Sequence, residues 1–357
     1  MKILDKYLLK HFFPAYLFAG IMFCFFYCLI DLLSNLNQFV DKGALITDVA
    51  KYYAFFLPSL WMQLSPLAVL IGVWFSVGLL AQDREIMAMR LAGISAIRIT
   101  MPLIISGLVI FSFCLGINIS LVPFCEEKKE EIWKGRIQGE EEYLSKRREN
   151  FPFTSHNVVY FTKNFSGKEG KMSEIQSVHT EKGSGDSIII NAKKALWENK
   201  KWFLTDGVRK IFGKNGNVKK IEEFKSEESS LSLSPHELWL YNKSPSIMPV
   251  KTLKKYITEY KTSISRYPYL AQFHARFSLP FINFTLLIIS IPLCLLSLHQ
   301  NSAGRMSWAL GLSLVYYVFF SLMLAMAEKG TIPPAFGIWL PNVLFFCVGI
   351  FYIWQKR

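Results

Sequence analysis

The sequence predicts a membrane protein with six transmembrane helices and one all-β domain inserted between the third and fourth helices. Three observations predict this fold class. Charge is unevenly distributed, because residues 123–270 hold 27 Lys+Arg and 20 Asp+Glu while the rest of the 357-residue chain holds 13 and 7. Six long apolar stretches occupy that remainder, as membrane spans require. Short β-rich runs fill the middle of the charged segment.

Each apolar stretch is long enough to cross about 30 Å of hydrocarbon at about 1.5 Å per residue. The stretches cover residues 12–34, 53–80, 99–122, 277–297, 306–327 and 335–354. The second contains Pro58 and Pro66, so we expect it to be kinked. The basic stretch Met1–His11 precedes an apolar run that is too long for a signal peptide, which predicts an uncleaved first helix.

Basic residues indicate how the helices are oriented. Four flanks that share one side of the membrane hold Lys2, Lys6, Lys10, Arg84, Arg90, Arg98, Arg305, Lys356 and Arg357. The short loops on the opposite side hold only Lys42, Lys51 and Lys329. Because short cytoplasmic loops are enriched in Lys and Arg, both termini are predicted to be cytoplasmic. Residues 123–270 are then on the outer side.

This outer segment begins with charged residues of helical composition, Glu126–Asn150, and continues as a predicted antiparallel sheet. The β-rich runs are 157–163, 172–179, 187–198, 201–205, 208–213 and 217–225. Hairpin residues separate them at Gly183-Ser184-Gly185, Asn199-Lys200, Asp206-Gly207 and Asn215-Gly216. Strands at this spacing favour a sandwich or a barrel-like sheet at about 150–245. An amphipathic helix, Val250–Tyr260, leads back to the membrane.

The chain therefore divides into three parts: residues 1–122 with the first three spans, 123–270 with the β domain, and 271–357 with the last three spans. The most informative motif, Ala81–Ser95, joins spans two and three. Helical spacing places Ile86, Met89 and Arg90 on one side, and Gly93 is expected to end the helix. A short charged helix tied to two spans can transmit force from a motor subunit. An ordinary amphipathic loop at the membrane surface has the same pattern, so the residues alone leave both interpretations open.

Several function classes find no support in the sequence. The formal net charge of +13 is not arranged as a nucleic-acid module, since no recognition-helix, zinc-finger or RNA-binding pattern is present. No phosphate-binding loop of the G-x-x-x-x-G-K-[ST] type occurs, so ATP chemistry must reside on another chain. Hydrolase motifs and metal-binding spacings are missing too, which predicts no catalytic residue and no metal.

The Ala81–Ser95 segment resembles the coupling-helix motif of the lipopolysaccharide-export permeases, the LptF/LptG family. The residues that match are Glu85, Ala88, Arg90 and Gly93-Ile94-Ser95. Further similarity lies at His274–Pro280, Glu328–Pro334, Trp339–Asn342, Ala195–Trp197 and Trp202–Gly207. The resemblance covers essentially the whole chain, and Leu4–Tyr7, Asp31–Leu33 and Tyr52-Tyr53 look closer to LptG.

The resemblance implies a permease subunit of an ATP-binding-cassette exporter in the cell inner membrane. Members pair as an F–G heterodimer, and an LptB-like ATPase dimer docks on their coupling helices, here at about residues 83–93. Their periplasmic β-jellyrolls continue a bridge of LptC- and LptA-like proteins toward the outer membrane. Glu85, Met89, Arg90 and Gly93 are thus the expected ATPase contacts. The chain itself is expected to bind no cofactor, because ATP is used by the partner.

One position departs from the family pattern. G-type members often carry a basic residue late in the first span, directed at lipid phosphates, whereas Asp31 is the nearest match here. A carboxylate cannot attract a phosphate. Lys42, Lys51 and Arg276 are substitute candidates, because Lys and Arg at the interface can pair with phosphates. They can equally be membrane anchors whose charges reach the headgroup zone.

Two other functions remain open at this stage. The chain could be a membrane-anchored scaffold whose outer β domain binds partner proteins without transporting lipid. A weaker alternative is a membrane enzyme that uses Asp31 or His274, although neither has a third partner group in the sequence.

Overall fold

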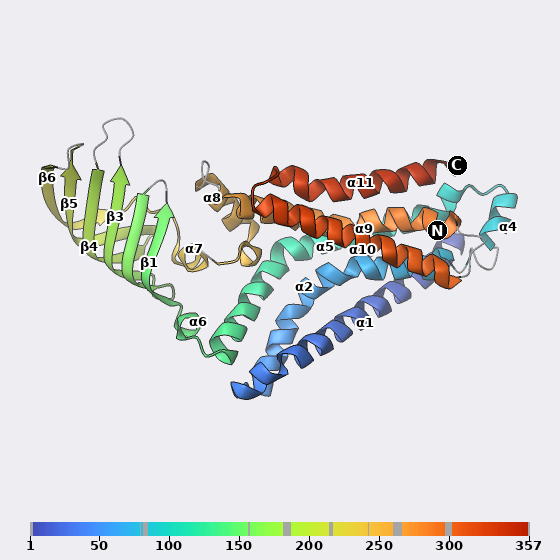
Figure 1. Cartoon of the computed structure of the whole chain (residues 1–357), viewed down its shortest axis with the longest axis horizontal. Coiled ribbons are helices and arrows are strands. Elements are labelled where there is room, and N and C mark those ends of the chain that lie inside the picture. Colours follow the sequence, from blue (N-terminus) through green and yellow to red (C-terminus); the bar gives the residue numbers. More distant parts are fainter. Residues whose placement is uncertain are drawn as a thin grey trace.

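The computed structural model describes residues 3–78, 80, 85–155, 158–180, 187–213, 217–241, 243–259, 266–296 and 302–355. Six long helices lie side by side, and the β domain extends from one end of them (Figure 1). They are α1 (Ile3–Asp41), α2 (Ile46–Val73), α5 (Ala96–Glu130), α9 (Tyr267–Leu296), α10 (Ser302–Glu328) and α11 (Pro334–Gln355). Each contains a stretch long and apolar enough to cross a membrane. The six predicted spans are therefore confirmed.

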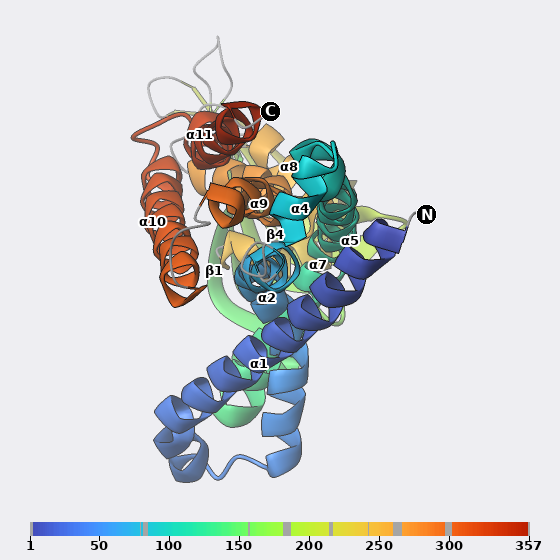
Figure 2. The ribbon, with the colours of Figure 1, turned by 90° about the vertical axis from the view of Figure 1, so that its right-hand side faces the viewer.

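Two of the helices are much longer than a bilayer requires. α1 has 39 residues and α5 has 35, which correspond to roughly 58 Å and 52 Å against about 30 Å of hydrocarbon. α2 runs on through both of its prolines and is extended by a π-helical turn, η1 (Trp74–Gly78). A second π-helical segment, η2 (Glu131–Ile137), extends α5. The α1–α2 hairpin consequently projects beyond the other helices (Figure 2).

The helices differ in how deeply they are packed. α9 is the most buried of the six, and α1 is the least buried. A fully buried amide, Asn342 of α11, links three helices: it accepts hydrogen bonds from Thr285 (3.1 Å) and Tyr316 (2.8 Å) and donates one to the Ser278 hydroxyl (2.7 Å). Interhelical hydrogen bonds of this kind hold helices together where the hydrophobic effect cannot.

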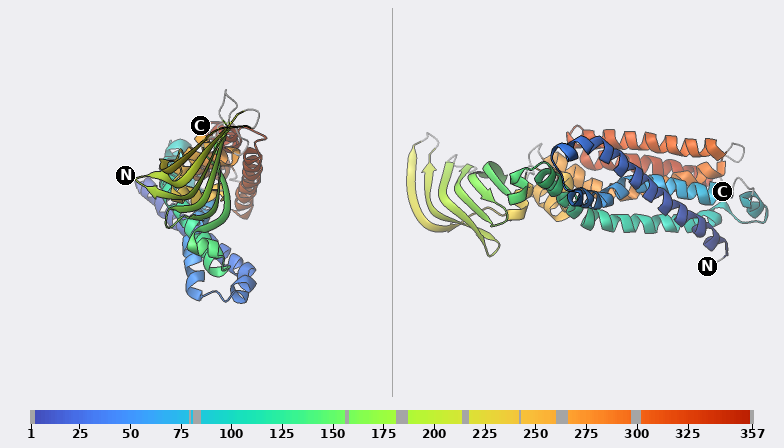
Figure 3. Two further views of the ribbon diagram at one scale, coloured as in Figure 1. Left: turned by 90° about the vertical axis from the view of Figure 1, so that its left-hand side faces the viewer. Right: turned by 90° about the horizontal axis from the view of Figure 1, so that it is seen from below.

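The β domain is a six-stranded antiparallel sheet in which each strand pairs with the next one along the chain. The strands are β1 (Arg147–Ser155), β2 (Val158–Ser166), β3 (Lys171–Thr180), β4 (Ser187–Glu198), β5 (Lys201–Phe212) and β6 (Val218–Glu228). β1 lies nearest the helices and β6 farthest from them (Figure 1). The strands curve around one face of the sheet (Figure 3). The described strands thus form one curved sheet and not a two-sheet sandwich.

The structure corrects two of the strand predictions. β1 begins inside the stretch Glu126–Asn150, which is predicted to be helical, and runs on to Ser155; helix α6 (Glu141–Ser145) ends just before it. The hairpin predicted at Asp206-Gly207 is wrong, because both residues lie inside the continuous strand β5. The turn at Asn199-Lys200 is confirmed, and both residues have positive φ angles. The predicted turns at Gly183–Gly185 and Asn215-Gly216 lie outside the described part of the chain.

A single transverse row of residues explains the Asp206-Gly207 error. We call this row the crease; it runs across the six strands through Asn150, Lys163, Glu174, Lys193, Asp206 and Lys225. Its members on alternate strands, Asn150, Glu174 and Asp206, have φ angles of 49°, 48° and 52°. Buried side chains on either side are three residues apart and not two, as at Met172 and Ile175. The crease therefore bends each strand while keeping its apolar residues on the inner face.

After β6 the chain returns toward the helices beneath the inner face of the sheet. Ser230 of this return segment (229–234) hydrogen-bonds Tyr160 of β2 (2.9 Å), and the Leu233 carbonyl accepts a bond from the Trp202 indole (2.7 Å). Leu231 and Leu233 are buried in the core of the domain. The return segment thus fills the inner side of the sheet before helix α7 (Pro235–Leu240) begins.

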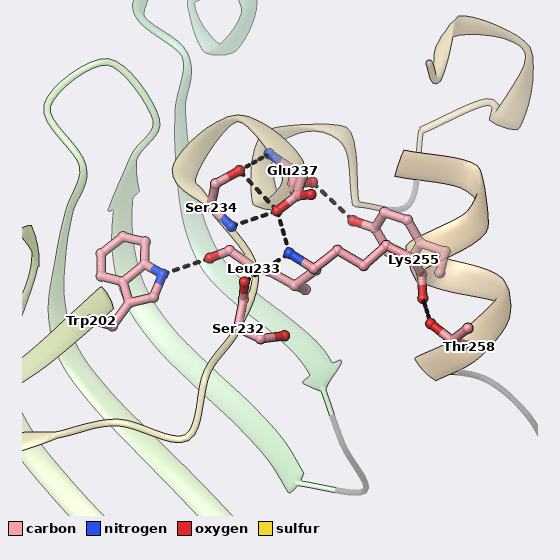
Figure 4. Close-up of polar contacts among 8 residues, drawn as sticks. Trp202, Ser232, Leu233, Ser234, Glu237, Lys255 and Thr258 are labelled. Carbon is pink, nitrogen blue, oxygen red and sulfur yellow. Dashed lines mark hydrogen bonds and ion pairs between the residues drawn. The ribbon is translucent and has the colours of Figure 1, made fainter. Parts of the chain in front are cut away.

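A compact polar cluster fixes α7 to the following helix, α8 (Val250–Glu259), which confirms the predicted amphipathic helix. Glu237 and Ser234 form a capping box at the start of α7, and Lys255 of α8 bonds the same carboxylate at 2.7 Å (Figure 4). The Lys255 ammonium also donates to the Ser232 carbonyl at 2.7 Å. Burial raises the pKa of Glu237, but the bonds from Lys255 and Ser234 outweigh burial and hold the pKa below its usual range.

Candidate functional site

The predicted coupling segment forms the short helix α4 (Glu85–Leu91), which lies at the end of the bundle opposite to the β domain (Figure 1). Its two sides differ sharply. Glu85 and Met87 are exposed, whereas Ile86 is only 2% exposed and Met89 is half-buried. Residues 83 and 84, and the side chain of Arg90, lie outside the described part of the chain. Among the described side chains, Glu85 is therefore the one that α4 offers as a charged outer contact.

Gly93 ends α4 as expected. Its φ of +84° is left-handed, and the Ile94 amide donates to the Met89 carbonyl at 3.0 Å, which is the Schellman pattern. Ser95 then caps α5 by accepting a bond from the Arg98 amide at 3.3 Å. Only three residues separate α4 from the cap of α5, and hydrogen bonds hold both helix ends. α4 is thus joined to α5 by a defined turn.

The buried side of α4 is anchored on the ends of other helices. Ile86 belongs to one apolar cluster with Leu8 and Phe12 of α1 and with Ile99 of α5. The same cluster continues to α9 through Ile291 and Cys294. A displacement of α4 must therefore be felt by several long helices at once, because close-packed interiors transmit strain.

An apolar groove of about 730 Å³ lies between α1, α2 and α5. Its lining is almost entirely hydrophobic: Ile21, Cys24, Phe25, Cys28, Ala50, Tyr53, Ala54, Leu57, Pro58, Trp61, Phe113, Ile117 and Leu121. α1 supplies one wall and is the least buried of the six helices. The groove has the size and apolar character of a site for hydrocarbon chains.

Asp31 lies about one turn beyond Cys28 on α1, beside this groove. The Tyr53 hydroxyl donates a 2.9 Å hydrogen bond to its carboxylate. Tyr53 itself lines the groove. The acidic residue at the position where the family often has a base is thus tied to α2, which pins the two helices together.

The three candidate phosphate contacts lie in two different settings. Lys42 and Lys51 are exposed at the α1–α2 hairpin. Arg276 of α9 is only 5% exposed. Its guanidinium donates to the carbonyls of Ser246, in the short helix η3 (Pro245–Ile247), and of Met248. Arg276 therefore satisfies backbone carbonyls of the segment that leads into α8, and no described contact joins it to Lys42 or Lys51.

Several contacts at the base of the β domain have no counterpart in a sequence pattern. Arg136 of η2 pairs with Asp48 of α2 at 2.8 Å. His236 of α7 lies 3.1 Å from Glu127 of α5. Lys243 is packed between two aromatic rings. The pairs Arg136–Asp48 and His236–Glu127 join residues far apart in the chain, as does the contact of Lys243 with Tyr143, so no local spacing could have revealed them.

The inner face of the sheet carries several apolar residues beyond the crease and is less covered there. Val158 and Tyr160 of β2 are buried. Residues paired across strands share a face, so the register places Ile188, Ile190 and Ile211 on the same side. These three isoleucines are only half-buried. The same register puts Arg209 and Glu222 on this side, so the sheet presents a partly open surface of mixed apolar and charged residues toward its outer strands.

The groove, the anchored short helix and the inserted β domain together define a multi-pass membrane protein of the permease class. Residues 6–355 match the model of the family described as lipopolysaccharide export system permease LptF/LptG, and the chain belongs to that family. A search of curated proteins found no match. The chain is accordingly an inner-membrane transport permease of lipopolysaccharide export, not an enzyme.

Proposed function

We propose that this chain is one permease half of an ATP-binding-cassette exporter that extracts lipopolysaccharide from the inner membrane, and that it is closer to the LptG type. The observation that carries the proposal is α4: an exposed Glu85 on a short helix whose other side is anchored to α1, α5 and α9. An LptB-like ATPase dimer would bind Glu85, Met89, Arg90 and Gly93. Its closure would move the helix ends that α4 contacts.

The proposed orientation has both termini and α4 in the cytoplasm and the β domain in the periplasm. The nine basic residues that the sequence puts in the flanks of one side support it, because positive residues favour the cytoplasmic face. Both chain ends lie at the α4 end of the bundle (Figure 1).

In the proposed transport step, the acyl chains occupy the groove between α1, α2 and α5, and the lipid then reaches the inner face of the β sheet. Lys42 and Lys51 would hold the phosphates, since both are exposed beside α1 and α2. Neutralising both residues to Gln should reduce photo-crosslinking of lipopolysaccharide to the groove, whereas Lys329→Gln should not. Unchanged crosslinking would leave the two lysines as membrane anchors. Arg276 is the weaker candidate because its guanidinium already bonds backbone carbonyls.

The outer strand β6 is the proposed contact for a periplasmic bridge of LptC- and LptA-like jellyrolls. Among the described strands it pairs only with β5, and it lies farthest from the helices (Figure 1). A free strand edge can accept a strand from another protein. A photo-reactive residue at Val218 should therefore crosslink to the bridge protein, and one at Val159 of β2 should not. Crosslinking from Val159 alone would contradict this assignment.

Gentle purification followed by mass spectrometry tests the whole proposal, because an ATPase, a sister permease and lipopolysaccharide should all be recovered. Glu85→Ala should weaken ATPase association and abolish most ATP-driven lipid release. Glu141→Ala is the matched control, since it removes an exposed acid from the first turn of another short helix. Normal association and release by Glu85→Ala would contradict the role of α4. A complex without lipid release would favour the scaffold function.

A further inference from the structure

An ion pair joins the first turns of α1 and α5 directly beside α4. Arg98 contacts Asp5 with both terminal guanidinium nitrogens: Nη2 donates a hydrogen bond to Oδ2 at 3.1 Å, and Nη1 lies at ion-pair distance, 3.0 Å, from Oδ1. The Asp5 side chain is 14% exposed and that of Arg98 is 39% exposed. This two-point contact fixes relative position more strictly than a single bond does.

The location of Arg98 is unfavourable for α5 taken alone. Ser95 is the cap of α5, so Arg98 is its third helical residue, where the helix dipole disfavours a cation. Asp5 lies in the first turn of α1, where an anion is favoured. Helix stability therefore does not account for the arginine, whereas a contact to α1 does.

The same arginine is tied to α4 through its backbone. The Arg98 amide bonds the Ser95 hydroxyl, and Ser95 follows the Schellman turn that closes α4. The Arg98 side chain thus contacts Asp5 of α1, while its main chain lies at the end of the α4–α5 turn. The apolar cluster that contains both Ile86 and Leu8 gives no directional contact.

We propose that Asp5 and Arg98 are positioning residues that transmit displacement of α4 to α1, and hence to the wall of the groove that α1 forms. The inference rests on the proposed function. α1 is the least buried of the six helices, so it depends most on such a contact to follow its neighbours. Without the ion pair, a displacement of α4 moves α5 but is not fully transmitted to α1.

The test uses the complete complex with its ATPase in proteoliposomes and measures lipopolysaccharide released per ATP hydrolysed. Asp5→Asn and Arg98→Gln should assemble and hydrolyse ATP but release about tenfold less lipid per ATP, a typical coupling loss. Arg98→Lys keeps the charge but loses the two-point geometry, so it should fall in between. The exchanged pair Asp5→Arg with Arg98→Asp should recover most of the loss. Lys201→Gln, which breaks the exposed pair with Glu228 in the β domain, is the control.

A second measurement remains informative if the exchanged pair folds poorly. Spin labels at Ile3 and Leu91, which are 91% and 82% exposed, report the distance between the start of α1 and the end of α4. Nucleotide should leave this distance unchanged in the native protein and should change or broaden it in Arg98→Lys. Unchanged coupling in the single variants, or loss of assembly as their only effect, would overturn the proposal. A native complex that releases no lipid would instead contradict the proposed function.

Discussion

The ammonium of Lys243 lies between two aromatic rings, 3.5 Å from the centroid of Tyr143 and 3.6 Å from that of Trp239. Tyr143 belongs to α6, where the chain enters the β domain, and Trp239 belongs to α7, where it leaves. Lys243 is 9% exposed, and no carboxylate lies within ion-pair distance of it among the described residues. In its charged form Lys243 therefore joins the two connections by cation–π attraction.

This burial predicts a pH-dependent stability. The pKa of Lys243 is lowered to about 7, mainly by burial; the charge of Glu130 opposes this shift and that of Arg148 adds to it. A lysine in the unfolded chain has a pKa of about 10.4. Between these values the unfolded chain holds the extra proton, so stability should rise with pH from about 7 to 10. Lys243→Met should lose this rise in thermal unfolding of the detergent-solubilised protein. Lys201→Met, at an exposed site, should keep it; an equal slope in both variants would contradict the prediction.

Glu237 should also make stability rise with pH, but in the acidic range. Its pKa is held below the usual range by Lys255 and Ser234, so its contribution is present above about pH 4.3 and is lost as the pH falls through the folded-state pKa. Glu237→Ala should lower the opening free energy of α7 and α8 amides by about 1–3 kcal/mol in hydrogen exchange. Glu237→Gln should lose less, since Gln also forms a capping box. Glu228→Ala is the exposed control and should change little.

Asn342 should be the most sensitive polar residue of the bundle. Replacement by Ala leaves Thr285, Tyr316 and Ser278 without a shared partner, and we expect a loss of about 1–3 kcal/mol. Single hydrogen bonds within membranes contribute about 0.6 kcal/mol each, so a loss of stability near the lower end of this range is more typical. Thermal unfolding in detergent would measure it against Val343→Ala, a neighbour that is 52% exposed. Equal effects of the two substitutions would show that the network contributes nothing specific.

Gly207 should not tolerate a side chain. An added Cβ would lie 2.1 Å from the Phe224 ring of β6, so Gly207→Ala should destabilise the β5–β6 pair by about 1–3 kcal/mol. Adding Phe224→Ala should relieve the clash, giving a favourable coupling in a double-mutant cycle of hydrogen-exchange protection. Additive effects of the two substitutions would contradict the contact.

Features with a long or local signal could be predicted from the sequence. The six spans follow from hydropathy, and the end of α4 follows from the left-handed preference of Gly93. β1 was missed because Arg147–Glu149 are charged and resemble the helical residues before them. The Asp206-Gly207 dipeptide is typical of a turn. In the structure Asp206 instead belongs to the crease, and Gly207 leaves room for the Phe224 ring.

The residues of the candidate site likewise fall into those that the sequence predicts and those that it does not. α4 and Glu85 could be predicted, because one short motif carries them. The pairs Asp5–Arg98 and Asp31–Tyr53 could not, since each joins residues whose proximity depends on helix packing. Arg276 was assigned from its charge, whereas its surroundings are backbone carbonyls of a segment 28 and 30 residues away.

The return segment 229–234 has a mechanical consequence. β6 is the outermost strand, yet the short return segment connects it directly to α7. The contact between Glu237 and Lys255 in turn fixes α7 to α8. Tension applied at the outer edge therefore has two routes to the membrane. One crosses five interstrand ladders that can shear in sequence, and the other runs along a few peptide bonds that cannot. A force applied to β6 is thus carried first by the return segment, and the sheet can bend without losing the hydrogen bonds between its strands.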